Sequence, residues 1–221
     1  MAVNDNAQKL RIDVISDVVC PWCFVGKKRL EEALSLADDV EAEVYWRPFQ
    51  LDGTIPQGGI PRQDYLDRKF GPERAKTVYE RIKGVGAEAG IPFAFDKIAI
   101  SPNTLDAHRL IRWAQATGSQ SQVKQRLFEL FFLEGKDIGD HSVLADVAED
   151  FGIGRDAALR LLASDTDRDE VKGEVEMASR MGVTGVPFFI FNNKLALSGA
   201  QPAEVIVQAM RQALAPDVAG T

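Results

Sequence analysis

Two cysteines, Cys20 and Cys23, stand three positions apart, and the chain holds no others. Three positions are close to one turn of a helix, so both thiols are expected on one face and within reach of each other. Thiols placed in this way can form a small disulfide with little movement of the backbone. The pattern indicates thiol–disulfide exchange, in which Cys20 attacks a disulfide as a thiolate and Cys23 then releases the reduced product.

The two residues between the cysteines favour the same chemistry. Pro21 suits the first turn of a helix, where the amide proton that proline lacks has no helical partner. Cys20 would then stand at a helix N-terminus, where a thiol pKa falls from about 8.5 to between about 3.5 and 7.5. Trp22 lies beside both thiols in sequence, so we expect Pro21 and Trp22 to contact the substrate and to control access to Cys20.

A pair of cysteines with this spacing is also half of many zinc sites. Zinc takes four ligands, however, and the two histidines of the chain, His108 and His141, are far from the cysteines in sequence. We therefore predict no metal site. Two inert buried cysteines are a weaker alternative still, given the proline between them at a helix start.

A second signal is Val186-Pro187, directly before a run of aromatic and β-branched residues. The simple interpretation is structural: proline is tolerated at the first position of a strand, because it removes no hydrogen bond from the interior of the ladder. The sharper interpretation is a cis peptide bond that faces the cysteines. The Val186 backbone would then pair with a bound substrate, with Pro187 as part of the catalytic site.

Hydrophobic periodicity outlines the elements that must hold these residues in place. Strand patterns alternate or are rich in β-branched residues, and helical patterns repeat every three or four positions. Strands are predicted at 10–16, 41–47, 187–191 and 194–197, and helices at 22–37 and from 202 onward. The first cysteine therefore follows the first strand and opens the first helix.

Residues 60–181 carry almost only helical patterns, separated by glycines and prolines. We predict an α/β fold of the order β-α-β … β-β-α with an inserted all-helical domain. The α/β domain is discontinuous, at 10–59 and 182–215, and the insertion occupies 60–181. The inserted helices are expected to roof the cysteine pair.

Composition excludes some classes of partner. The 221 residues include 26 basic and 33 acidic side chains, for a net charge of −7. An acidic protein repels phosphate backbones, so we expect no nucleic acid partner. No apolar stretch long enough to span a bilayer and no signal-peptide pattern is present, so we expect a cytoplasmic protein with no membrane partner. Reducing conditions there disfavour structural disulfides, which again points to a redox use of the pair.

The chain resembles the DsbA-like oxidoreductases, and within them the FrnE-like branch, beside the 2-hydroxychromene-2-carboxylate isomerases and kappa-class glutathione transferases. The resemblance covers most of the chain and is carried by the segments 16–23, 47–49, 101–109 and 182–189. It implies a thioredoxin fold with a helical insert, Cys20 as nucleophile, Cys23 as resolving thiol and Pro187 in cis. Implied substrates are protein or small-molecule disulfides and dithiols, with glutathione as a possible co-substrate and no other cofactor. Monomer and homodimer both remain open.

The chain departs from its relatives at two positions. Many thioredoxin-fold enzymes keep a buried acid six residues before the nucleophile, to take the proton of the resolving thiol, and Val14 stands there instead. The related isomerases and transferases carry serine at the position of Cys20 and tend to place an acid near the start of the last helix. No acid occurs in the stretch 198–201.

Three further residues from the matching segments are candidates for substrate binding, namely Phe49, Asn103 and His108. Asn103 and His108 would face the cysteine groove from the insert. The simpler alternative for His108 is a histidine of the core or surface. Two other functions stay open at this point: a glutathione-dependent isomerase or transferase of an aromatic small molecule, and a disulfide-linked chaperone or binding module.

Overall fold

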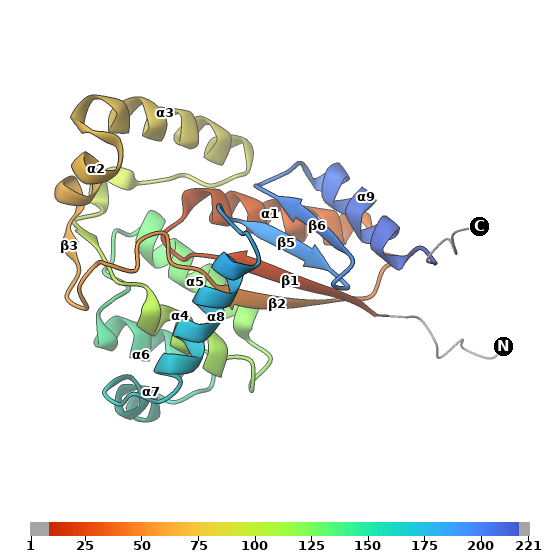
Figure 1. The fold of residues 1–221 in the computed structure, drawn as a ribbon. Coiled ribbons are helices and arrows are strands. Elements are labelled where there is room, and N and C mark those ends of the chain that lie inside the picture. Colours follow the sequence, from red (N-terminus) through yellow and green to blue (C-terminus); the bar gives the residue numbers. More distant parts are fainter. Residues whose placement is uncertain (1–8, 217–221) are drawn as a thin grey trace.

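The computed structural model describes residues 9–216 of the chain (Figure 1). In chain order the elements are β1 (Leu10–Ser16), α1 (Pro21–Leu36), β2 (Ala42–Pro48), β3 (Ile60–Pro61), α2 (Arg62–Phe70), α3 (Pro72–Glu88), a 3-10 turn (Phe95–Lys97), β4 (Ile100–Ser101), α4 (Leu105–Trp113), α5 (Gln120–Phe132), α6 (His141–Asp150), α7 (Arg155–Leu162), α8 (Arg168–Arg180), β5 (Phe188–Phe191), β6 (Leu195–Ser198) and α9 (Ala203–Leu214).

The main sheet has four strands in the order β2-β1-β5-β6. The pair β1 and β2 is parallel, with Val14 opposite Trp46, and α1 forms the crossover that a parallel pair requires. Strand β5 runs antiparallel to β1 and continues into β6 through a hairpin. This arrangement confirms the predicted order β-α-β … β-β-α, and it places the end of β1 in the middle of the sheet.

Helices cover both faces of this sheet. Val14 and Phe189 pack with α1 and α9 in the main core, whereas Ile15 belongs to a separate small cluster with Ala178 of α8. Because neighbouring residues of a strand point to opposite faces, α8 lies across the sheet from α1 and α9. Figure 1 shows α8 crossing β1 and β2 on one side, with α1 and α9 on the other.

The prediction that the insert is all-helical is wrong at one place. Strands β3 and β4 form a short antiparallel ladder, with Ile60 opposite Ser101 and Pro61 opposite Ile100. The ladder is short because Pro61 has no amide proton to donate. Two paired residues leave no alternating pattern in the sequence, so periodicity could not reveal them. The ladder ties the start of α2 to the segment that leads into α4.

The insert packs directly against the helix that carries the cysteines. Phe24 of α1 stacks on Phe128 of α5 with ring centroids 4.9 Å apart, inside one buried cluster that continues from the sheet into the insert. The boundaries proposed at 59/60 and 181/182 stay a prediction. Within residues 9–216, no helix combines the length and apolar character needed to span a bilayer.

Candidate active site

The turn between β1 and α1 positions the two cysteines. Cys20 has an extended backbone at the N-cap of α1, and Pro21 follows it in the first turn. The amides of Cys23 and Phe24 both donate to the Cys20 carbonyl, at 3.0 and 3.3 Å, which closes the first turn around it. Both thiols are free; Cys20 is 3% exposed and Cys23 is fully buried.

The surroundings of the two thiols separate their acidities. The hydrogen bond from Cys23 lowers the pKa of Cys20, and backbone amides of the first turn add to this effect while burial opposes it. Burial raises the pKa of Cys23 well above that of an ordinary thiol, and its bond to Cys20 raises it further. Cys20 is therefore the more acidic thiol of the pair, and Cys23 holds its proton more tightly.

The loop before β5 lies against Cys20. The Val186–Pro187 peptide bond is cis. Cys20 Sγ lies 3.5 Å from the Val186 carbonyl oxygen, although 166 positions separate the two residues. Pro187 is buried, and Val186 stays half-buried beside the thiol. The structure thus brings Cys20, Cys23 and Pro187 together.

Gly26, in the second turn of α1, lets Pro187 approach this helix. A Cβ atom on Gly26 would stand 2.7 Å from Pro187 Cγ, closer than real Cβ contacts come, and a tight 3.3 Å from Pro187 Cβ. Glycine inside a helix costs about 1 kcal/mol relative to alanine, so its place here has a packing reason. A glycine in the middle of a predicted helix was the sequence signal for this residue.

We expect Gly26→Ala to destabilise the protein by about 1–3 kcal/mol and to slow disulfide exchange, because the added methyl displaces Pro187. Urea unfolding checks the stability. The matched control is Gly84→Ala in α3, where a Cβ meets nothing within 4 Å and the helix should gain about 1 kcal/mol. Equal effects of the two substitutions would contradict the role given to Gly26.

Asp17 lies beneath the cysteine turn and was not among the residues predicted for the site. Its side chain is 1% exposed, and its backbone carbonyl accepts the amide of Cys20 at 3.2 Å. One carboxylate oxygen accepts the amide of Leu51 at 2.8 Å, and the other lies 3.2 Å from His108 Nε2. Asp17 therefore fixes the turn from inside rather than contacting a substrate.

His108 belongs to this inner layer. It is 3% exposed, and its Nε2 donates to the carbonyl oxygen of Phe49 at 2.9 Å as well as facing Asp17. Burial lowers the pKa of His108 below its ordinary value, so the ring is neutral at physiological pH. The structure places His108 and the Phe49 backbone behind the cysteines.

Asn103 holds a loop together. Its side-chain amide donates to the Ile55 carbonyl at 2.6 Å, while its oxygen accepts from Gln50 at 3.1 Å and from the Leu105 amide at 2.9 Å. Pro21 and Trp22 are half-buried next to Cys20. Of the residues proposed to bind substrate, Pro21, Trp22 and Val186 thus flank the thiol, whereas Asn103, His108 and Phe49 support it.

Residues 11–211 match the family described as DSBA-like thioredoxin domain. The chain belongs to this family. It is 30% identical over 203 residues to the uncharacterized protein YwbO of Bacillus subtilis, covering 91% of this chain and 96% of YwbO. It is 32% identical to a probable DsbA oxidoreductase, SCO1869, of Streptomyces coelicolor, whose crystal structure superposes with a TM-score of 0.82 over 92% of this chain and 89% of that one.

Two more distant structures share the fold. A 2-hydroxychromene-2-carboxylate isomerase, 17% identical, superposes with a TM-score of 0.69 over 91% of this chain and 95% of its own. The cytosolic disulfide reductase DsbM of Pseudomonas aeruginosa, solved with glutathione, is also 17% identical, with a TM-score of 0.63 over 91% of this chain and 99% of its own. The fold of this DSBA-like chain is thus shared by proteins described as an isomerase and as a disulfide reductase.

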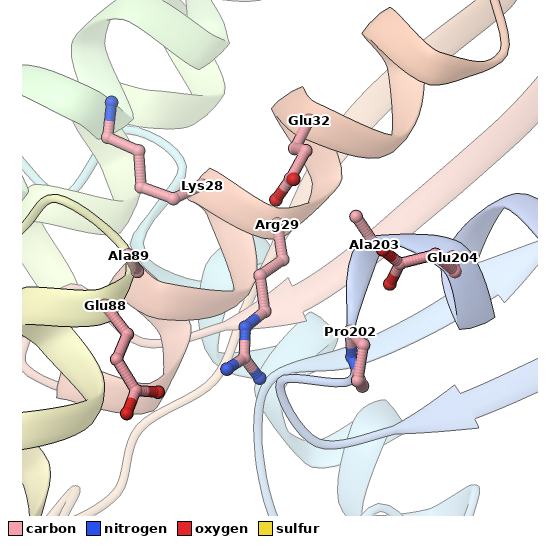
Figure 2. Close-up of a pocket in the computed structure, with 8 residues that line it drawn as sticks. All are labelled: Lys28, Arg29, Glu32, Glu88, Ala89, Pro202, Ala203 and Glu204. Carbon is pink, nitrogen blue, oxygen red and sulfur yellow. The ribbon is translucent and has the colours of Figure 1, made fainter.

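This DSBA-like protein has a charged cavity of 410 Å³ farther along α1 (Figure 2). Lys28, Arg29 and Glu32 line it from α1, and Glu88 lines it from the end of α3. Figure 2 shows the Arg29 guanidinium directed between α3 and the start of α9. Arg29 also donates to the Ala200 carbonyl.

The same cavity corrects the comparison with the glutathione-dependent relatives. The last helix begins at Ala203, and Glu204 stands in its first turn and lines the cavity. The stretch 198–201 therefore ends before the helix starts. The absence of an acid in that stretch is no argument against the binding of glutathione.

The position of the missing acid is also clear in the structure. Val14 is 1% exposed and packs in the main core. Asp13, its neighbour, points to the other face and is held by Arg11 at 2.6 Å and Arg47 at 2.7 Å. Neither residue can take a proton from Cys23. Among the described residues, no group of three or more histidine, cysteine or acidic side chains is arranged to hold a metal ion.

Proposed function

We propose that this protein is a thiol–disulfide oxidoreductase that exchanges its Cys20–Cys23 pair with protein or glutathione disulfides. The observation that carries the proposal is the difference in acidity and position between the two thiols. Cys20, with its lowered pKa, lies beside the Val186 carbonyl, and fully buried Cys23 keeps its proton one turn behind. Exchange needs both a nucleophilic thiolate and a second thiol that waits.

The reaction proceeds in two displacements. The Cys20 thiolate attacks one sulfur of a substrate disulfide; a bond forms to Cys20 Sγ, the substrate disulfide breaks, and the second substrate sulfur leaves as a thiolate. Cys23 then loses its proton and attacks Cys20 Sγ. The Cys20–Cys23 disulfide forms, and the remaining substrate sulfur leaves with the electron pair. Oxidation of a substrate dithiol is the same path in reverse.

Glutathione is the proposed co-substrate that returns the pair to the dithiol state. Two glutathione molecules supply the two electrons and leave as glutathione disulfide. The DsbM structure supports this choice, because that protein is described as a cytosolic disulfide reductase and was solved with glutathione. A cytoplasmic location of this chain is part of the proposal, since glutathione keeps that compartment reducing.

Turnover of insulin disulfides with reduced glutathione tests the proposal. We expect the purified protein to accelerate insulin reduction well above the rate with glutathione alone, in proportion to enzyme concentration. The same assay run with an oxidised pair and a reduced peptide dithiol checks the reverse direction.

One result would replace this function with its alternative. If neither direction is catalysed, and the protein instead isomerises 2-hydroxychromene-2-carboxylate in a glutathione-dependent way, then it is an isomerase. The fold alone does not decide this, because the isomerase structure shares it. The decisive difference lies in the residue at position 20, which is cysteine here.

A further inference from the structure

Lys124 of α5 is a buried cation without a carboxylate partner. Its side chain is fully buried, and no acidic oxygen of the described side chains, in 9–71 and 74–216, forms an ion pair with it. Its Nζ lies 5.1 Å from the centroid of the Phe128 ring and 5.6 Å from that of Trp46, and it donates to the Ser16 carbonyl at 3.5 Å. Burying an ammonium with so few partners is costly, so a functional reason is expected.

The position of Lys124 is directly beneath the cysteine turn. Ser16 is the last residue of β1, four positions before Cys20. Phe128, which Lys124 touches, stacks on Phe24, the residue that follows Cys23. Lys124 therefore reaches from the insert into the layer behind Cys23, across 108 positions of sequence from Ser16.

Charged groups from three segments face this amine. Cys20, Cys23 and Lys27 come from α1 and its N-cap, Asp17 from the turn after β1, and His108 from α4. Burial lowers the pKa of Lys124 to about 8, against the opposing influence of the thiols and Asp17. In return, the Lys124 charge lowers the pKa of Cys23, although burial of that thiol and its bond to Cys20 dominate and raise it.

Cys23 needs a proton acceptor when it attacks the mixed disulfide. The acid that many thioredoxin folds use is Val14 in this chain, and Asp13 is held by two arginines on the other face. Asp17 already accepts from the Leu51 amide and faces His108 with its other oxygen. His108 Nε2 is already engaged by the Phe49 carbonyl and Asp17, and Lys27 is paired with Glu31. Lys124 is the buried group of this layer for which the described side chains show no ion pair.

We propose that Lys124, supplied by the helical insert, takes up the proton of Cys23 and stabilises its thiolate while Cys23 resolves the mixed disulfide. The inference rests on the proposed function. Lys124 acts through Cys23 and is a positioning residue, not one that touches the substrate.

Resolution of the mixed disulfide begins with a proton transfer from Cys23 to Lys124. In the mixed disulfide, Cys23 is a thiol, and the step starts from the fraction of molecules in which the Lys124 amine, with its pKa of about 8, is neutral. The proton moves to that amine and leaves a thiolate–ammonium pair. Cys23 Sγ then forms a bond to Cys20 Sγ, the bond from Cys20 to the substrate sulfur breaks, and that sulfur departs with two electrons. The departing thiolate takes its proton from solvent.

Reaction of the reduced protein with dithiobis(nitrobenzoate) separates the two displacements in one trace. The first release of the coloured thiolate reports the attack by Cys20, and the second reports the attack by Cys23. We expect Lys124→Met to leave the first phase near the wild-type rate and to slow the second phase at least about tenfold at neutral pH. A rise of about 1 in the pKa of the Cys23 thiol lowers its thiolate fraction about tenfold.

The pH profile of the second phase distinguishes proton uptake from a purely structural role of Lys124, because a structural role would leave the pH dependence of the rate unchanged. In the wild type the rate should rise with pH and level off near the Lys124 pKa of about 8. In Lys124→Met it should keep rising beyond that point, because the thiol must ionise without help. Lys124→Arg should also be slow at neutral pH, since a guanidinium cannot take up a proton there.

Lys27→Met is the matched control, because it removes another buried lysine whose amine is already paired with Glu31. Its second phase should stay close to that of the wild type. An unchanged second-phase rate and pH profile in Lys124→Met, or a full rate in Lys124→Arg, would overturn the inference. Absence of a first phase in the wild type would instead overturn the proposed function, so the two failures are distinguishable.

Discussion

Replacing Cys20 with serine is expected to abolish disulfide exchange, lowering the rate of insulin reduction by at least about a thousandfold. A serine oxygen cannot form the mixed disulfide, and the second thiol cannot substitute for the first. Cys23 is fully buried and its pKa is raised well above the ordinary thiol value, so it offers neither access nor thiolate. The insulin assay with reduced glutathione measures the loss.

Cys23→Ser is the control that separates loss of attack from loss of the fold. Cys20 keeps its place at the N-cap of α1 in this variant, so it should still attack a disulfide and then remain linked to it. Intact mass measurement under non-reducing conditions should show the trapped adduct. A serine hydroxyl at position 23 can still donate a hydrogen bond to Cys20 Sγ, as the Cys23 thiol does, so the attack itself should stay close to the wild-type rate. Full activity in Cys20→Ser would show that the thiol is a bystander.

The parts of this site that lie close together in sequence were predictable from residue types alone. Cys20 and Cys23 share a helix start, and helical spacing fixes their proximity. The main sheet was also predictable, because strands with β-branched residues and helices with a repeat of three or four leave separate patterns. Pro187 was predicted as a site residue only because it precedes a strand at the point of the β-α-β … β-β-α order that is expected to face the cysteines.

The supporting residues come from distant segments and left weaker signals. Asp17 meets His108 across 91 positions, and Lys124 reaches Ser16 across 108. No periodicity reveals which remote segments meet, because tertiary packing decides it. One signal was available for Lys124: it stands within the apolar face of α5, between buried Val123 and Leu127. A lysine at such a position is rarely buried without a purpose.

Lys124→Met is expected to make the protein more stable at neutral pH, even though it slows the second displacement. Burial lowers the pKa of this lysine from 10.5 to about 8, which means that the folded state binds the proton less tightly than the unfolded chain does. At neutral pH the difference opposes folding by about 3 kcal/mol at most. Methionine has a similar length and apolar stem, so it can fill the space against Trp46 and Phe128 without the charge.

The pH dependence fixes the sign of this effect. Between about 8 and 10.5 the unfolded chain still holds the proton that folded Lys124 has lost, so wild-type stability from this group rises with pH across that window. Lys124→Met lacks the rise, and its advantage should shrink from neutral pH toward the alkaline end. Urea unfolding of both reduced proteins at several pH values measures the difference, in which other titrating groups cancel. A variant less stable than the wild type at neutral pH would mean that Lys124 is held for packing. A more stable but slower variant would mean that the fold keeps a costly buried cation because Cys23 needs it.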